Sequence, residues 1–385
     1  MEKNKLYVLI LLYFAFIALG LPDQLLSVAW PTMRIDFQKP LDAAGLSIFL
    51  VTVFTSLSGY LNGYVAARFS VQKILVVSVL LTAIGLLGYA FSPSWFIFLL
   101  FSIPLGIGAG SVDSSLNNYV SVHYSSRHMN WLHAFWGVGS TLGPLIMTGV
   151  FAFNFGWRSG YFIVSAMLFM LSFIFALSGK FWENVSFKSE GQKSAETVKI
   201  VGLNTFLSAL FFFLYTSTEG GIGLWMYSVM TEARGFEPTL AGILTAVYWG
   251  SLTFGRIIVG FITKKFTDKQ IIFTGIVIAL ISMGMLCSTS KILTAAALIT
   301  LGFGLSGIYP CLMNDTHKRY KPEIAQILTG HQVGAANLGY ATVTPLLGII
   351  IQRIGLNFLP VILIFFVLII LFIELRLRKL NLYNQ

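Results

Sequence analysis

Long apolar segments alternate with short polar ones along almost the whole chain. An α-helix needs about 20 predominantly apolar residues to cross a bilayer, and segments of that length recur throughout the sequence. Only helices and closed barrels satisfy their backbone hydrogen bonds in lipid, so the pattern predicts an all-α polytopic membrane protein. We predict twelve membrane-spanning helices, at residues 6–33, 43–67, 71–92, 95–123, 129–153, 157–179, 201–231, 238–264, 268–288, 291–316, 323–352 and 355–376.

The first apolar segment begins like a secretory signal peptide, with a basic tip in MEKNKLYVLILLYFAFIALGL. Its apolar run is longer than that of such a leader, no cleavage site of small residues follows it, and many more spans come after it. We therefore interpret this segment as the first membrane span.

The longest polar stretch, KFWENVSFKSEGQKSAETVK, separates the sixth predicted span from the seventh and carries charges of both signs. We interpret residues 180–200 as a cytoplasmic linker between two six-helix bundles, residues 1–179 and 201–385. Matching features support a repeat with a nearly constant offset of 196 to 198 residues: LGIGAG with LGFGLS, GYVAARFS with GFITKKFT, Asp23 with Glu219, and His133 with His331.

Composition and charge narrow the class of protein further. The chain is 56% hydrophobic and 10% charged, with a net charge of +10 and a mean hydropathy of +0.80. If both termini are cytoplasmic, the inner segments hold 18 of the 25 lysines and arginines and the outer segments hold six, which agrees with the positive-inside rule. We therefore expect the positive charge to face an anionic inner leaflet rather than a nucleic acid. The two cysteines form no disulfide or metal-ligand pattern.

The sequence resembles the major facilitator superfamily over nearly its whole length, because two parallel six-helix repeats are the plan of that family. The family pattern G-x-x-x-D-R-x-G-R/K after the second span has its counterpart in Gly63, Ala67 and Arg68, with alanine at the acidic position. FGRIIVG in the eighth span, which contains Arg256 and Gly260, is also similar to the family. The resemblance implies structural or gating roles for Gly63, Arg68, Arg256 and Gly260.

Within the superfamily, the sequence resembles the fucose–galactose–glucose:proton symporter family and its bacterial relatives. That family has an acidic residue in its fourth helix, followed by an asparagine, an aromatic residue and a β-branched residue, here Asp113, Asn117, Tyr119 and Val120. Asp113 and Asn118 stand where the pattern usually has Glu and Pro. LPDQLLSVAWP and EGGIGLW are also similar to members of this group. The resemblance implies that the acid of the fourth helix is the protonation site.

Three acidic residues lie well inside the predicted spans: Asp23, Asp113 and Glu219. A charge at bilayer depth costs about 2.5–3.5 kcal/mol on insertion scales, so such residues are typical of functional sites. Asp23 lies about 26 Å into its span at 1.5 Å per residue, in the outer half, and Asp113 lies in the inner half of its own span. Burial disfavours the charged form of a carboxylate. We expect Asp113 to be the main proton carrier, Asp23 its outer partner and Glu219 either a further member of the proton path or a group that binds a hydroxyl or a cation. A structural role is the alternative for each.

A sugar site needs amides that form hydrogen bonds and an aromatic face for the ring. The resemblance implies that the first, fourth, seventh and tenth helices line the substrate site. The candidate substrate-binding residues are Asn117, Asn118, Gln24, Trp225, Asn314 and Gln332. Aromatic residues make up 15% of the chain, so most of them are expected to face lipid or to pack rather than to bind a substrate.

Four further features are open to more than one interpretation. The glycines that follow Glu219 favour a broken helix at that point. Arg256 is the only basic residue well inside a span, and we expect it to pair with Asp315 near the cytoplasmic end. The middle of the membrane would then hold no cation, which favours a neutral or cationic solute over an anion. Histidine titrates near neutral pH, but His133 and His331 are more simply explained as structural residues near the inner headgroups.

These features predict a proton-coupled symporter that imports a neutral polar solute, above all a sugar, by alternating access. The alternative is proton-coupled efflux of a lipophilic or cationic drug or of a lipid-like molecule, which the many aromatic residues would suit. The amides around Asp113 favour import of a polar solute. A membrane enzyme is not favoured, because no nucleophile–base spacing is recognisable, and a solute sensor would need a signalling extension beyond the tail RLRKLNLYNQ.

The expected partners are protons, a small solute and the lipid bilayer, with no nucleic acid, metal or cofactor. We expect a monomer that crosses the plasma (cytoplasmic) membrane several times, with both termini in the cytoplasm.

Overall fold

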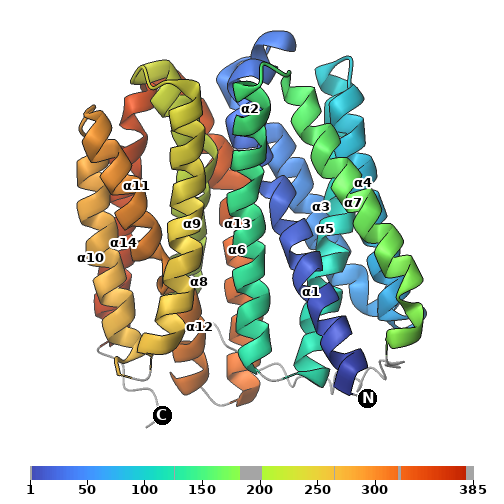
Figure 1. Ribbon diagram of the computed structural model, residues 1–385. Coiled ribbons are helices and arrows are strands. Elements are labelled where there is room, and N and C mark those ends of the chain that lie inside the picture. Colours follow the sequence, from blue (N-terminus) through green and yellow to red (C-terminus); the bar gives the residue numbers. More distant parts are fainter. Residues whose placement is uncertain (1, 125, 183–201, 264, 320–321, 379–385) are drawn as a thin grey trace. The chain divides into compact units, whose positions relative to one another are not determined.

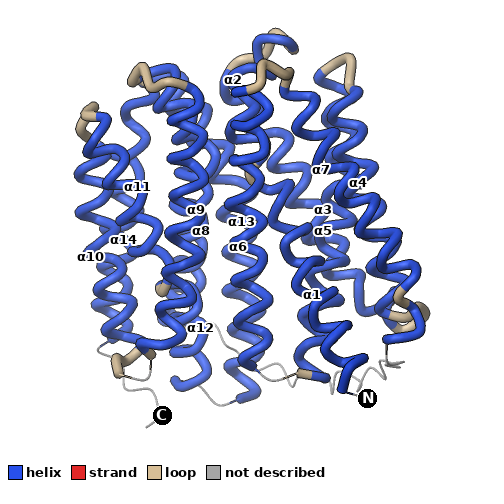
Figure 2. The backbone as a smooth tube through the Cα atoms, viewed as in Figure 1, coloured by secondary structure: helices blue, strands red, loops and turns tan. Residues whose placement is uncertain are grey.

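The computed structural model describes residues 2–124, 126–182, 202–263, 265–319 and 322–378, and every regular element in those ranges is helical (Figure 2). The chain divides into two compact units, Met1–Ser194 and Ala195–Gln385. From residue 183 onward, the predicted linker 180–200 lies outside the described residues.

The described part of the N-terminal unit contains seven α-helices (Figure 1). α5 packs against both α3 and α4, α1 packs against α6, and α4 packs against α7. Short 3₁₀ turns, Leu41–Ala43 and Gly179–Phe181, flank this bundle. The helices are α1 (Glu2–Asp23), α2 (Leu25–Asp36), α3 (Ala44–Ala66), α4 (Val71–Phe91), α5 (Trp95–His123), α6 (Ser126–Ala152) and α7 (Trp157–Leu177).

The C-terminal unit repeats this packing. α8 packs against α13 as α1 does against α6, α11 packs against both α9 and α10, and α10 packs against α14. The same helix pairs therefore meet in both units, at the offset that the sequence repeat predicts. The helices are α8 (Leu203–Ser228), α9 (Pro238–Ile262), α10 (Asp268–Leu286), α11 (Lys291–Ser306), α12 (Ile308–Arg319), α13 (Pro322–Ile354) and α14 (Leu359–Arg378), with a π-helical turn at Val229–Ala233 and a 3₁₀ turn at Leu356–Phe358.

Eleven segments of the described chain are long and apolar enough to cross a membrane. They coincide with eleven of the twelve predicted spans. The remaining span corresponds to α8, a helix of 26 residues in which most of the second half is buried inside the C-terminal unit. The all-α, multi-pass architecture predicted from the apolar segments is confirmed.

Two predicted spans are each formed by two helices rather than one. The first span is interrupted at Gln24, whose backbone (φ −113°, ψ 1°) is not helical, and α2 begins after it. The tenth span is interrupted at Gly307, between α11 and α12. Each interruption lies within a predicted membrane segment, next to residues that the sequence marks as polar.

The prediction of a broken helix after Glu219 is wrong, because α8 runs without interruption through that point. The glycines serve close packing instead. A Cβ atom on Gly220 would lie 2.6 Å from the ring of Tyr340 on α13, and one on Gly221 would lie 2.7 Å from the side chain of Leu347. Small residues allow membrane helices to approach closely, which is the simpler reason for this pair.

The contact between α3 and α5 is both tight and polar. A Cβ atom on Gly110 would lie 2.0 Å from the carbonyl oxygen of Thr55. Along the same contact, Ser58 Oγ donates a hydrogen bond of 2.7 Å to a carbonyl oxygen of α5, and the Asn62 side chain bonds both Ser114 and Ser115. These hydrogen bonds satisfy polar groups that lipid could not.

Replacing Gly110 with alanine is expected to destabilise the protein, since the nearest obstacle is backbone that cannot rotate away. Overpacking costs about 1–3 kcal/mol, which corresponds to a melting temperature about 5 °C lower. Thermal unfolding of the purified protein in detergent measures the effect. Gly149→Ala on α6 is the matched control, because a Cβ atom there meets nothing within 4 Å. Equal stability of the two variants would contradict the importance of this contact.

An ion pair and several rings join α2 to α7 at the end of the N-terminal unit opposite its N terminus (Figure 1). Arg158 Nη1 lies 3.1 Å from Asp36 Oδ2, and the indole of Trp157 donates a 2.7 Å hydrogen bond to the same oxygen. Arg158 also lies 4.2 Å from the Trp157 ring centroid. In the described part of the chain, Asp36 and Arg158 share no hydrogen bond or ion pair with Asp23, Asp113 or Glu219, so this pair serves as a control in several experiments.

Candidate functional site

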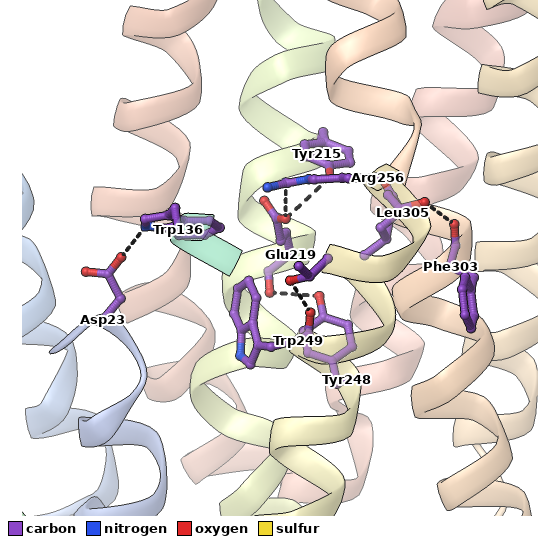
Figure 3. A network of polar contacts seen from close by, with 11 residues as sticks. Asp23, Trp136, Tyr215, Glu219, Tyr248, Trp249, Arg256, Phe303 and Leu305 are labelled. Carbon is purple, nitrogen blue, oxygen red and sulfur yellow. Dashed lines mark hydrogen bonds and ion pairs between the residues drawn. The ribbon is translucent and has the colours of Figure 1, made fainter. Parts of the chain in front are cut away.

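Asp23 is placed by the break in the first span. It is the last residue of α1, and its Oδ2 accepts a 3.0 Å hydrogen bond from the indole N–H of Trp136 on α6 (Figure 3). α1 and α6 approach closely here, since a Cβ atom on Gly139 would lie 2.2 Å from the carbonyl oxygen of Ile17. Gln24, at the break, is 3% exposed. The predicted residues Asp23 and Gln24 are thus adjacent at an irregular point of a membrane segment.

Asp113 lies on α5 and its side chain is exposed, as is that of Asn118. Asn117, one turn further along the helix, donates a 2.9 Å hydrogen bond to Asp113 Oδ1 and a 3.0 Å bond to the Asp113 carbonyl oxygen. A spacing of four residues places two side chains on the same face of a helix, so this contact was predictable from the sequence. The amide holds the carboxylate in one orientation without neutralising its charge.

Among the described residues, neither Asp23 nor Asp113 forms an ion pair with a lysine or arginine. Each accepts a hydrogen bond from a neutral donor instead. A charged carboxylate in contact with hydrocarbon is costly, so both groups must be reached by water or carry a proton for part of the time. Carboxylates that no fixed cation holds in the charged form are suited to taking up and releasing protons.

Glu219 differs from these two acids, because it is paired with a cation. Arg256 Nη2 on α9 lies 3.1 Å from Glu219 Oε1 on α8, and the two side chains are 20% and 13% exposed (Figure 3). We expected Arg256 to pair with Asp315, but the ion pair that the structure shows is with Glu219. The expectation rested on the distance along α9 from Lys264, which says nothing about which neighbouring helix the long arginine side chain reaches.

Two buried tyrosines support the Glu219–Arg256 pair (Figure 3). The Tyr215 hydroxyl lies 3.0 Å from the carbonyl oxygen of Leu305 and 3.4 Å from Glu219 Oε1, and its single proton can be donated to either oxygen. The Tyr248 hydroxyl donates a 3.3 Å hydrogen bond to the carbonyl oxygen of Glu219. The pair is therefore positioned from α8, α9 and the end of α11.

This ion pair also corrects the argument that the middle of the membrane holds no cation. Arg256 lies beside a predicted functional acid, so a positive charge is present at that site. Glu219 compensates that charge, and the pair is neutral as a whole. A preference for neutral solutes therefore rests on compensation within the pair rather than on the absence of a cation.

Three of the predicted substrate-binding residues have partners inside the C-terminal unit. Trp225 is fully buried and its indole donates a 2.8 Å hydrogen bond to the carbonyl oxygen of Thr344. Gln332 is also fully buried and donates to the hydroxyls of Ser208 and Thr316. Asn314 donates a 2.8 Å bond to Asp268. These contacts give each side chain a structural role.

The remaining predicted residues lie at helix ends or on exposed faces. Arg68 is exposed just after α3 and has no ion-pair partner in the described ranges. Gly63 and Gly260 occupy the last turns of α3 and α9, where an added Cβ atom would meet nothing within 4 Å. His133 is exposed, with its ring 5.6 Å from that of Phe16, and His331 is exposed on α13. Structural or gating roles remain predictions for Arg68, Gly63 and Gly260.

Asp268 and Arg234 are among the buried charges of the C-terminal unit that sequence reasoning missed. Asp268, at the start of α10, is 5% exposed and is bound by Lys318 and Asn314 of α12. Arg234, after the π-helical turn, is 9% exposed and donates to Asn357, Thr294 and the carbonyl oxygen of Leu286. Both residues stand at the ends of predicted spans, where charge is usual, so nothing in the sequence distinguished them.

Comparison with known proteins supplies the class of protein. The sequence model of the Major Facilitator Superfamily matches residues 12–330. The chain is 21% identical over 322 residues to the glucose/mannose transporter GlcP of Bacillus subtilis (strain 168), covering 77% of this chain and 78% of that protein.

Two solved structures extend the comparison to the fold. A bacterial homologue of the human lysosomal transporter Spinster superposes with a TM-score of 0.82 at 15% identity, over 98% of both chains. A D-xylose–proton symporter superposes with a TM-score of 0.77 at 15% identity, over 95% of this chain and 96% of that one. At these identities the structural likenesses show a shared fold.

Proposed function

The chain belongs to the major facilitator superfamily of membrane transporters, and we propose that it imports a neutral sugar together with protons. The observation that carries this proposal is the pair Asp23 and Asp113. Both acids lie in membrane segments of the N-terminal unit, and neither has a lysine or arginine partner among the described residues. The similarity to a glucose/mannose transporter and to a D-xylose–proton symporter supports the class of solute and of driving ion.

In this proposal Asp113 is the main proton carrier. Its exposed carboxylate can exchange protons with water, and Asn117 can donate to it in either protonation state. A proton bound at Asp113 removes a charge whose transfer into a non-polar environment would be costly. If the sugar binds more tightly to the protonated form, each ligand favours the binding of the other, and this reciprocity is the physical basis of coupling.

Asp23 acts as the second carboxylate of the proton path in this proposal. Trp136 holds the Asp23 side chain toward α6 by its hydrogen bond. Asn117 and Asn118, which carry amides on the same helix as Asp113, are the proposed contacts of this unit with the sugar.

We also propose that the protein lies in the plasma membrane with both termini in the cytoplasm and that it acts as a monomer. The distribution of lysine and arginine supports this orientation, because the basic residues concentrate in alternate loops. Labelling of an introduced cysteine near each terminus from one side of the membrane would test it.

Measurement of proton movement in proteoliposomes tests the function directly. The purified full-length protein is reconstituted with an internal pH indicator, and neutral sugars are added one at a time without an imposed gradient. Acidification of the lumen after one sugar, absent from protein-free vesicles, is the expected result.

The opposite result has a defined meaning. No response across the whole panel, in vesicles shown to be sealed and loaded, would overturn sugar–proton symport. The same vesicles would then be tested with lipophilic cations and lipids, which are the solutes of the alternative efflux function.

A further inference from the structure

The two units carry different chemistry at equivalent positions of the repeat. The offset of 196 to 197 residues pairs Asp23 with Glu219, Asp113 with Tyr309, and Gly59 with Arg256. The N-terminal unit therefore has two acids and a glycine at these positions. The C-terminal unit has one acid, a tyrosine and an arginine that is bound to the acid.

The two sites therefore differ in how their carboxylates are compensated. The N-terminal acids have no fixed cation among the described residues and can change protonation state. Glu219 instead forms an ion pair with a guanidinium group at 3.1 Å. A carboxylate–guanidinium pair is stabilised by a charge-assisted hydrogen bond, so proton loss from arginine or proton uptake by glutamate would break it. The pair therefore offers a hydrogen-bond acceptor and a hydrogen-bond donor side by side, an arrangement suited to binding a polar solute.

Part of the pair remains open to a ligand. Glu219 Oε1 is occupied by Arg256, whereas Oε2 accepts no hydrogen bond from a described residue. An ionised carboxylate offers about four acceptor positions, and arginine offers five N–H donors in one plane. The side chains are 13% and 20% exposed, so both groups reach the surface of the unit. An acceptor and a donor thus lie next to each other and are partly accessible.

Two adjacent hydroxyl groups of a sugar match this arrangement. One hydroxyl can donate to Glu219 Oε2 while its neighbour accepts from the Arg256 guanidinium group. Tyr309 on α12 is half-buried, and its ring centroid lies 5.8 Å from that of Tyr215, the tyrosine beside Glu219. Tyr340 on α13 is also half-buried and packs against α8 directly after Glu219, at Gly220. Aromatic faces beside a polar pair are suited to the apolar side of a sugar ring.

We propose that the Glu219–Arg256 pair recognises two neighbouring hydroxyls of the transported sugar and makes Arg256 a specificity-determining residue. This inference rests on the proposed function and assigns proton coupling and hydroxyl recognition to different units. It predicts that the pair determines affinity for the sugar, whereas the N-terminal acids determine the effect of pH.

The test measures exchange of labelled for unlabelled sugar across proteoliposomes, a reaction with no net proton movement. Removing a single partner leaves an uncompensated charge that can impair folding, so the main variant is the double Glu219→Gln/Arg256→Gln, which removes both charges. The half-saturation concentration is expected to rise about 10- to 100-fold, the loss of one or two hydrogen bonds to charged groups. The pH dependence of accumulation should stay that of the unsubstituted protein.

A series of sugars lacking one hydroxyl at a time sharpens the test. In the unsubstituted protein, two adjacent ring positions should each be needed for affinity, and in the double variant the discrimination at those two positions should disappear. The double variant Asp36→Asn/Arg158→Gln removes an ion pair of the same 3.1 Å length elsewhere in the chain and should leave affinity and discrimination unchanged.

Each other outcome overturns the inference in an identifiable way. A folded double variant with unchanged affinity would give the pair a structural role only. Normal exchange with loss of accumulation would make the pair part of the proton path. If the unsubstituted protein exchanged no sugar at all, the proposed function itself would fail, and the inference with it.

Discussion

Asp113→Asn is expected to abolish proton-driven accumulation of the sugar while leaving exchange largely intact. Asparagine has nearly the size of aspartate and resembles its neutral, protonated form, so it can still accept a hydrogen bond from Asn117. It cannot release a proton, and the energy of the gradient is no longer linked to the sugar. With one proton per sugar, a potential of 100 mV supplies about 2.3 kcal/mol, or about 50-fold accumulation, and the variant should reach a ratio of about 1.

Labelled sugar taken up by energised proteoliposomes, followed to steady state, measures this ratio. Asp36→Asn is the matched control, since it makes the same chemical change in an ion pair at the end of the N-terminal unit. That variant should accumulate sugar as the unsubstituted protein does. Persistent accumulation by Asp113→Asn would show that another group carries the proton, and Asp23→Asn would then be the next variant to measure.

The architecture follows from the sequence because membrane helices obey two simple constraints. Apolar length determines where a span lies, and the need to satisfy the backbone in lipid makes the span a helix. The Asp113–Asn117 contact could also be predicted from the sequence, since it depends only on the spacing of four residues along one helix. The helix pairs of the two units agree with the repeat for the same reason: related segments have related apolar faces.

The contacts between different helices could not be predicted from the sequence. Glu219 and Arg256 are 37 residues apart on different helices, and their pairing depends on the rotation of α8 and α9 about their axes. The interruptions at Gln24 and Gly307 also escaped prediction, because each surrounding segment is apolar enough over its whole length to be interpreted as one continuous span. The glycines after Glu219 were read as a break, although the structure uses them for contact with α13. A glycine in the sequence indicates that a side chain is disfavoured at that position. It does not indicate whether the backbone must be flexible there or another helix must pack closely against it.

The equivalent positions of the two units indicate a substitution that would give the N-terminal unit the carboxylate–arginine arrangement of the C-terminal unit. Arg256 forms an ion pair with Glu219, and the equivalent of Arg256 in the N-terminal unit is Gly59 on α3. Gly59 packs against α5 one turn before Asp113, with the carbonyl oxygen of Gly110 the nearest atom to an added Cβ, at 3.7 Å. That distance is an ordinary van der Waals contact. The site therefore has room for the first atom of a side chain beside α5, three residues along that helix from Asp113.

Gly59→Arg is accordingly expected to uncouple the transporter by the opposite route to Asp113→Asn. A guanidinium group about 4 Å from the Asp113 carboxylate stabilises its charged form by about 4 kcal/mol at an effective dielectric constant of 20. Accumulation should be lost because the acid no longer takes up a proton. Exchange should also weaken by about tenfold or more, because the protonated form is the one proposed to bind the sugar, and each 1.4 kcal/mol is worth a factor of ten.

Two further variants separate this charge effect from a steric one. Gly59→Gln introduces a long side chain without a charge and should retain accumulation. The double variant Gly59→Arg/Asp113→Asn should recover exchange without recovering accumulation, since its neutral amide no longer responds to the added cation. If Gly59→Gln failed as completely as Gly59→Arg, size rather than charge would be responsible. If the double variant stayed inactive in exchange while folding normally, the added arginine would act on something other than Asp113. Recovery of exchange alone would identify Asp113 as the acid whose protonation state governs both sugar binding and coupling.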